Sequence, residues 1–136
     1  MISTGCPQGF IQYGSLCYNF NTTLVSWFEA RDTCQRLGAI LAEPKTVGEN
    51  TFIKDLFIQN GGSNTWLGAS DLGQEGQWRW ESSGDRMSGF NNWWPGQPDN
   101  SRGVQDCLLM YKNRNYTWDD SHCDGQASFV CQTASV

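Results

Sequence analysis

The sequence has few of the residues on which enzyme active sites and thiolate metal centres depend. It contains one histidine among 136 residues, no Cys-x-x-Cys pair, no Gly-x-Ser-x-Gly motif and no phosphate-binding glycine loop. Asp119 and Asp120 form an acidic pair, but neighbouring residues on one strand point to opposite faces and do not flank a glycosidic bond. These features predict that the protein is not an enzyme and that it has no zinc site.

Long apolar runs and positive charge are also scarce. No run of about 18 apolar residues exists, which argues against membrane insertion. The formal net charge is -5, so phosphate groups would be repelled and a nucleic-acid partner is not expected. The first five residues have neither the basic nor the apolar segment of a signal peptide, and we interpret Met1 as an artificial start or the processed end of a mature chain.

Cysteine, by contrast, is plentiful. The six cysteines are Cys6, Cys17, Cys34, Cys107, Cys123 and Cys131. An even number at this density in a short chain indicates disulfides and an oxidising compartment, and therefore a secreted, extracellular protein. Spacing alone does not decide how six cysteines pair.

The length predicts one domain, residues 1–136. Ser26 and Thr46 each precede a glutamate by three residues, a capping-box pattern that predicts a helix beginning at each position. Gly38 and the pair Gly61-Gly62 predict where these helices end. The apolar residues expected to face the core are Phe28, Ala30, Cys34 and Leu37 in the first helix, and Phe52, Ile53, Leu56 and Phe57 in the second.

Strand-forming residues dominate the rest of the chain. Residues 10–20 predict a hairpin around a Gly-Ser turn. Further short strands are expected at 66–69, 77–80, 107–111, 116–118 and 128–131. Residues 82–106 lack a clear element, and a stretch of this length is typical of a functional loop. Trp93 and Trp94 within it favour an ordered loop over a disordered one.

A set of motifs at family spacing resembles the C-type lectin-like domain. They are the spacing of the last four cysteines, Trp66-Leu67-Gly68-Ala69, Gln97-Pro98-Asp99 four residues after Trp93, and Trp118-Asp119-Asp120 before Cys123. The resemblance covers nearly the whole chain, from Cys6 to Cys131, and is greatest to small soluble mollusc lectins of the perlucin type. It implies an α+β C-type lectin-like fold, with two helices, antiparallel sheets and a long calcium-binding loop region.

The same resemblance implies the covalent and metal-binding pattern. The bridges would be Cys6–Cys17, Cys34–Cys131 and Cys107–Cys123. The ligands of one Ca²⁺ ion would be Gln97, Asp99, Gln105, Asp119 and Asp120, with Pro98 following a cis peptide bond. A second ion would take Asp71, Glu75, Asn100 and Asp106, although these residues could equally cap loops and pair locally.

Two of the implied ligands depart from the family pattern. Gln105 stands where glutamate is usual, and Asp119 stands where asparagine is usual. The two exchanges cancel in charge, so Asp99, Asp119 and Asp120 still provide three carboxylates. We therefore expect calcium binding to persist.

Members of this family bind sugars by direct coordination of two vicinal hydroxyls to the ion. Each hydroxyl also needs one donor and one acceptor from the protein. By the resemblance, Gln97 with Asp99, and Gln105 with Asp119, would supply these groups, while Trp94 would either stack on the sugar or pack internally. The Gln-Pro-Asp motif implies terminal galactose or N-acetylgalactosamine (GalNAc).

Two alternatives to galactose binding stay open. The double exchange could restore a mannose-like arrangement of donors and acceptors, giving mannose-type or broad specificity. Other domains of this fold bind proteins or minerals without sugar, and fold alone does not fix function. The resemblance further implies innate recognition of cell-surface or microbial glycans. Because single sugar sites are weak, we expect a non-covalent homo-oligomer.

Overall fold

The computed structural model describes residues 5–74, 76–98 and 106–136, and these residues form an α+β fold. The elements in chain order are β1 (Ile11–Tyr13), β2 (Leu16–Val25), α1 (Trp27–Arg36), β3 (Ile40–Leu41), α2 (Val47–Asn60), β4 (Asn64–Ser70), β5 (Arg79–Trp80), β6 (Cys107–Tyr111), a 3₁₀ turn (Lys112–Arg114), β7 (Thr117–Ser121) and β8 (Ala127–Ala134).

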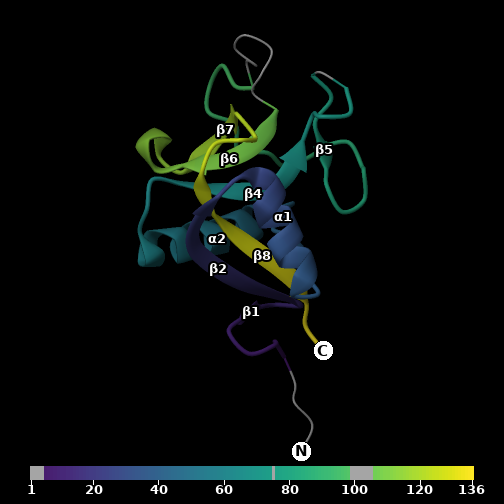
Figure 1. The fold of residues 1–136 in the computed structure, drawn as a ribbon, viewed down its shortest axis with the longest axis vertical. Coiled ribbons are helices and arrows are strands. Elements are labelled where there is room, and N and C mark those ends of the chain that lie inside the picture. Colours follow the sequence, from purple (N-terminus) through teal and green to yellow (C-terminus); the bar gives the residue numbers. More distant parts are fainter. Residues whose placement is uncertain (1–4, 75, 99–105) are drawn as a thin grey trace, which may run out of the picture.

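The strands join into one sheet with the order β1-β2-β8-β4-β6-β7 (Figure 1). Strand β3 pairs with β8, and β5 pairs with β4. All pairings are antiparallel except that of β4 with β8, which is parallel. Gly5 and Val136 exchange two backbone hydrogen bonds, so the two ends of the described chain lie together.

Both helices begin where the sequence predicts. The Ser26 hydroxyl accepts from the Glu29 amide at 3.2 Å, and the Glu29 carboxylate accepts from the Ser26 amide at 3.5 Å, which completes a capping box. At α2 the Thr46 hydroxyl accepts from the Glu49 amide at 3.1 Å. The Glu49 carboxylate accepts from the Lys45 backbone amide at 3.0 Å and not from that of Thr46. In the described segments, neither helix is long and apolar enough to cross a membrane.

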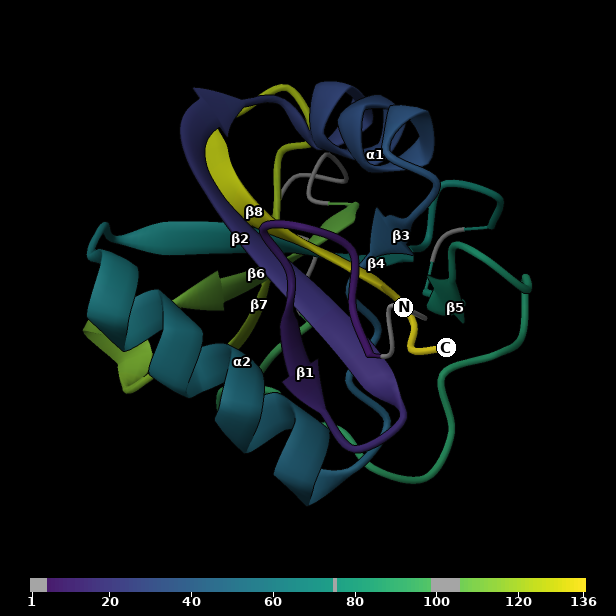
Figure 2. The ribbon, with the colours of Figure 1, turned by 90° about the horizontal axis from the view of Figure 1, so that it is seen from below.

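The sheet is buried on both faces, because α1 and α2 lie on opposite sides of β2 and β8 (Figure 2). Successive strand residues therefore enter different apolar clusters. In β6, Leu108 faces the cluster that contains α2 residues and Leu109 faces the cluster that contains α1 residues. In β8, Val130 faces the cluster with α2 residues and Phe129 faces the cluster with α1 residues. Each such side chain contributes about 1.5–3 kcal/mol through burial.

The predicted core is largely confirmed, with one correction in α1. Three of the four predicted residues of α2 are buried, and Trp66, Trp78 and Trp80 of the strands join them in the core. In α1 the buried face consists of Trp27, Ala30 and Cys34, and Leu37 is 53% exposed. Leu37 is the C-cap, with φ -88° and ψ 4°, so the chain leaves the helical path before its side chain can reach the core.

The strand predictions are confirmed in outline and differ in extent. The hairpin of β1 and β2 turns at 14–15, but β2 continues to Val25, beyond the predicted segment. Only Arg79–Trp80 of the predicted 77–80 strand is extended and paired. Strand β3 and the parallel pairing of β4 with β8 were not predicted, because both depend on contacts between distant parts of the chain.

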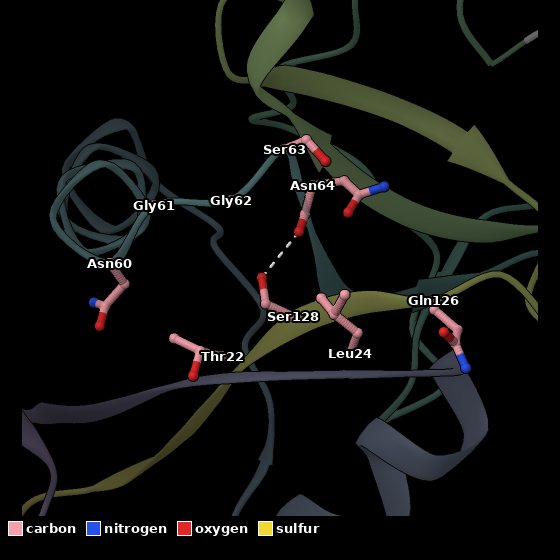
Figure 3. Close-up of a pocket in the computed structure, with 9 residues that line it drawn as sticks. All are labelled: Thr22, Leu24, Asn60, Gly61, Gly62, Ser63, Asn64, Gln126 and Ser128. Atoms are coloured by element: carbon pink, nitrogen blue, oxygen red, sulfur yellow. Dashed lines mark hydrogen bonds between the residues drawn. The ribbon is translucent and has the colours of Figure 1, made fainter.

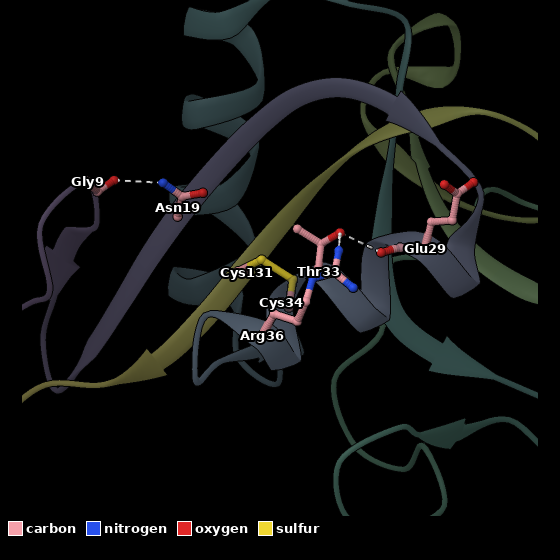
Figure 4. The surroundings of a disulfide bond; sticks show 7 residues. All are labelled: Gly9, Asn19, Glu29, Thr33, Cys34, Arg36 and Cys131. Carbon is pink, nitrogen blue, oxygen red and sulfur yellow. Dashed lines mark hydrogen bonds between the residues drawn. A yellow bond between two sulfur atoms is a disulfide. The ribbon is translucent and has the colours of Figure 1, made fainter.

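The three disulfides pair as the resemblance implies: Cys6–Cys17, Cys34–Cys131 and Cys107–Cys123. Figure 4 shows the second of them joining the last turn of α1 to β8. Next to it, the Thr33 hydroxyl donates to the Glu29 carbonyl at 2.8 Å and accepts from the Arg36 guanidinium at 3.0 Å. This bridge therefore fixes α1 against the central strand of the sheet.

We predict that removing the Cys34–Cys131 bridge destabilises the protein more than removing Cys6–Cys17. The two bridges span 97 and 11 residues. The chain-entropy estimate is about 4.7 kcal/mol for the longer loop and about 2.8 kcal/mol for the shorter one. Urea unfolding of the two paired Cys→Ala variants measures the difference. Equal losses of unfolding free energy would contradict the expectation.

Candidate functional site

The predicted ligands Asp119 and Asp120 lie on β7, in a hairpin with β6. Asp119 is opposite Leu109, and Asp120 is opposite Leu108. The Cys107–Cys123 disulfide ties the start of β6 to the chain just after β7. The position of both carboxylates is thus set by a sheet pairing and a covalent bond.

Trp118 anchors the strand directly before these carboxylates. Its side chain is fully buried, and its indole Nε1 donates to the Asn50 side-chain oxygen on α2 at 2.9 Å. Trp80, Phe90 and Trp93 meet its ring edge-on, with ring centroids 6.1, 5.8 and 5.9 Å away. Edge-to-face contacts of this kind hold ring orientation as well as burying area.

The loop that carries Gln97 is hydrogen-bonded to the outer edge of β7. The Trp118 amide donates to the Asn92 carbonyl at 2.8 Å, and the Trp94 amide donates to the Trp118 carbonyl at 2.9 Å. The Gln97 amide then donates to the Trp94 carbonyl at 2.8 Å. These bonds bring the segment of Trp94 and Gln97 alongside the strand of the two aspartates. The Gln97-Pro98 bond is cis, as the resemblance implies.

The two carboxylates differ in their surroundings. The Asp120 residue is 2% exposed, whereas the Asp119 side chain is 13% exposed. One Asp119 oxygen accepts from the Asp120 amide at 3.0 Å, which turns that carboxylate back along the strand. The other Asp119 oxygen forms an ion pair of 2.9 Å with Arg114.

Arg114 was not among the predicted site residues. It lies in the 3₁₀ turn between β6 and β7, and its Cζ is 5.8 Å from the centroid of the Trp94 ring. The guanidinium therefore touches two residues of the predicted sugar site, Asp119 and Trp94. A cation five positions before the acidic pair, across a short turn, was the signal present in the sequence.

Trp93 and Trp94 take different roles. Trp93 packs against the core, edge-on to Trp78, with ring centroids 5.0 Å apart. Trp94 is 36% exposed. Arg114 lies over the Trp94 ring, and part of the Trp94 residue remains exposed to solvent.

Of the five predicted calcium ligands, Gln97, Asp119 and Asp120 belong to the described residues. Asp99 and Gln105 lie outside them. Within 5–74, 76–98 and 106–136, no three His, Cys, Asp or Glu side chains gather around one point. The side chains of Gln97, Asp119 and Asp120 still suit the ion chemically, because Ca²⁺ prefers carboxylate and amide oxygens. A carboxylate as buried as that of Asp120 also favours a compensating positive charge.

Two of the four residues of the predicted second ion site, Asp71 and Asp106, belong to the described residues. The Asp71 amide donates to the Asp106 carbonyl at 3.0 Å, so these two residues lie together where β4 ends and β6 begins. The Asp71 carboxylate accepts from the Gly76 amide at 2.9 Å and thereby closes a turn. Glu75 and Asn100 lie outside the described residues. This second site remains a prediction.

A separate hollow of about 380 Å³ contains none of the predicted ligands. It lies where the end of α2 and the start of β4 meet β2 and β8 (Figure 3). Its lining residues are Thr22, Leu24, Asn60, Gly61, Gly62, Ser63, Asn64, Gln126 and Ser128. None of them is charged. Inside it, the Ser128 hydroxyl donates to the Asn64 carbonyl at 2.9 Å. A neutral hollow of this kind offers no carboxylate for a calcium ion.

Two groups with clearly shifted pKa values lie elsewhere in the fold. Burial raises the pKa of the Tyr18 hydroxyl, and the nearby Glu49 charge adds to the effect. Burial also raises the pKa of the Glu81 carboxyl, against the opposing charge of Arg31. Neither group belongs to the predicted calcium or sugar ligands.

The fold and motifs together define the protein class. Residues 23–133 match the Lectin C-type domain family, and the chain belongs to that family. This is a family of lectin domains and not of enzymes. Among known proteins the chain is similar to Perlucin of Haliotis laevigata, with 42% identity over 134 residues, covering 97% of this chain and 85% of Perlucin.

Solved structures agree with this family. The carbohydrate-recognition domain of the mouse scavenger receptor C-type lectin has a TM-score of 0.87 and 27% identity, covering 96% of this chain and 98% of that one. A calcium-independent type II antifreeze protein has a TM-score of 0.86 and 26% identity, covering 99% of this chain and 98% of that one. The fold prediction and the perlucin-type resemblance are both confirmed.

We predict that Asn50→Ala lowers the free energy of unfolding by about 1–3 kcal/mol, because it leaves the buried Trp118 N–H without its acceptor. Chemical denaturation of the purified variant provides the measurement. Gln59→Ala, which truncates an exposed amide on the same helix, is the matched control and should change stability by at most about 0.5 kcal/mol. Similar losses in both variants would disprove the anchoring role of Asn50.

Proposed function

We propose that this domain is a Ca²⁺-dependent lectin that binds terminal galactose or GalNAc. One observation carries the proposal: the edge of β7 that bears Asp119 and Asp120 is hydrogen-bonded to the loop that bears Trp94 and Gln97. This pairing gathers carboxylates, an amide and an aromatic ring in one region. Those are the groups that a calcium ion and a sugar require.

The proposed ion would be held by Gln97, Asp99, Gln105, Asp119 and Asp120. These residues provide carboxylate and amide oxygens, which suit a hard cation with six to eight flexible contacts. When bound, the ion supplies two coordination positions for vicinal sugar hydroxyls. The side chains around it would supply the donors and acceptors that orient those hydroxyls.

The galactose preference is supported by the Gln97-Pro98-Asp99 motif. Gln97 would donate and Asp99 accept at one hydroxyl, while Gln105 would donate and Asp119 accept at the other. Trp94 is exposed enough to meet the apolar face of a sugar ring. The exchange at Gln105 and Asp119 supports the second candidate, mannose-type or broad specificity.

A non-sugar role of the same fold is the remaining alternative. The similar type II antifreeze protein is calcium-independent, so this fold does not require the ion. We favour the lectin because three carboxylates are retained in the proposed ligand set despite the two exchanges. A secreted, extracellular protein that forms a non-covalent homo-oligomer and recognises cell-surface or microbial glycans would fit this activity.

We predict that Asp120→Asn weakens Ca²⁺ binding by at least about tenfold, a loss seen even for groups that only support metal ligands. The reason is that the variant removes a buried negative charge from the ion without changing side-chain size. Calorimetric titration with Ca²⁺ measures the effect. The control is Asp55→Asn, the same change at an exposed position on α2. Unchanged affinity in Asp120→Asn would remove this residue from the ligand set.

Glycan-array binding with Ca²⁺ and with EDTA tests the sugar directly. We expect signal on terminal galactose or GalNAc that disappears in EDTA and in Asp99→Ala. A dominant mannose signal would establish the second candidate instead. Absence of any calcium-dependent signal would leave the protein- or mineral-binding alternative in its place.

A further inference from the structure

Arg114 holds a fixed positive charge inside the region proposed to bind sugar. Its guanidinium pairs with Asp119 at 2.9 Å and lies 5.8 Å from the centroid of Trp94. Of the ion pairs in which both partners are described residues, this one involves a proposed calcium ligand, and the pairs Arg31–Asp32 and Lys45–Glu43 do not. The location is notable because the chain as a whole carries a net charge of -5.

The turn between β6 and β7 fixes where this cation stands. The Arg114 carbonyl accepts from the Thr117 hydroxyl at 2.6 Å. Asn115 and Tyr116 follow with φ near +60°, so the chain reverses at once and returns as β7. The aromatic ring and the carboxylate then restrict the Arg114 side chain from two directions. A guanidinium restricted in this way loses little further freedom when it binds a ligand.

Among the described residues, the pairing with Asp119 leaves Arg114 with N–H groups that have no acceptor. A guanidinium has five N–H groups in a planar fork, and the described contact with Asp119 involves one nitrogen. The side chain is 37% exposed, so part of the fork faces solvent. Such a fork recognises oxyanions, because two parallel N–H groups match two oxygens of a carboxylate or sulfate.

Charge balance admits the same ligand class. The proposed ligand set has three carboxylates around a divalent ion, which leaves one negative charge. That charge would repel an anionic sugar. Arg114 cancels it at Asp119, the side where the second hydroxyl would bind. Without such a cation, the site would disfavour any sugar carrying a carboxylate or sulfate.

We infer that Arg114 is a specificity-determining residue that makes the site prefer glycans with an oxyanion substituent beside the coordinated hydroxyls. The inference rests on the proposed sugar site. The oxyanion is either the carboxylate of an acidic sugar or a sulfate ester. Both offer paired oxygens to the guanidinium.

The test compares dissociation constants for galactose, galactose 6-sulfate and galacturonate in Ca²⁺, measured by calorimetry. Mannose, mannose 6-sulfate and mannuronate form the parallel series if the neutral ligand is mannose. Wild type should bind at least one anionic sugar about three- to tenfold more tightly than its neutral parent, the range expected for a partly exposed charge-assisted contact. The sulfate and carboxylate arms identify which oxyanion is preferred.

We define the ratio as the dissociation constant of the neutral sugar divided by that of the anionic sugar. In Arg114→Gln this ratio should fall to one or below, and in Arg114→Lys it should be intermediate. Arg36→Gln, at an exposed position of α1, should keep the wild-type ratio. Calcium titration of each variant, without sugar, reports separately on the ion site. A specificity role is supported if Arg114→Gln binds calcium within threefold of the wild-type affinity but no longer prefers the anionic sugar.

Three results would overturn the inference. One is a wild-type ratio of one with neutral sugar still bound in Ca²⁺, which leaves the proposed function intact. Another is an Arg114→Gln variant that keeps the ratio, or that binds calcium but no sugar, since Arg114 would then merely support Asp119. The last is no sugar binding by wild type in either series, which defeats the proposed function as well.

Discussion

The outer edge of β7 is the constraint on which the proposed site depends. An edge strand presents unpaired amide and carbonyl groups, and proteins usually cover them. Here the cover is a loop: Trp118 donates to Asn92 and accepts from Trp94. The same two hydrogen bonds that close the sheet also fix the loop carrying Gln97 against the strand carrying Asp119. Closing the sheet edge and assembling the candidate site are therefore one structural event.

Burial on both faces explains why polar residues are so restricted in this fold. The central strands β4, β6 and β8 have almost continuous buried apolar residues, because each face is packed. Asp119 and Asp120 interrupt this pattern only on the edge strand. A buried carboxylate is costly without a compensating charge or donors. A calcium ion would supply such compensation for Asp120, whereas Arg114 supplies it for Asp119.

Local features of the fold were readable from the sequence, and features that depend on distant contacts were not. The two helix starts follow from Ser26 and Thr46, whose capping partners lie three residues away. The disulfide pairing came from family resemblance, since spacing left many alternatives. The short β3 and the parallel pairing of β4 with β8 have no local signature. Leu37 was misassigned because the apolar periodicity extends to it, whereas Arg36 is the last helical residue and Leu37 is the C-cap.

The candidate site divides in the same way. The motifs identified Gln97, Asp119 and Asp120, and the structure shows how β7 and the adjoining loop hold them. Asp99 and Gln105 lie outside the described residues, so their part in the ligand set rests on the motif. Arg114 stands five positions before Asp119 in the sequence, but that spacing does not show whether the two side chains meet, because this depends on the backbone of the turn between them.

Arg114 also changes how the exchange at Asp119 should be understood. By sequence alone, aspartate in place of the usual asparagine adds a negative charge, and Gln105 removes one elsewhere. In the structure the added charge has a partner of its own, a guanidinium 2.9 Å away. The two exchanges are therefore not simply a swap of charge between two proposed ligands. At Asp119 the proposed site has a paired acid and base, with an aromatic ring beside the base, where the family pattern has one neutral amide.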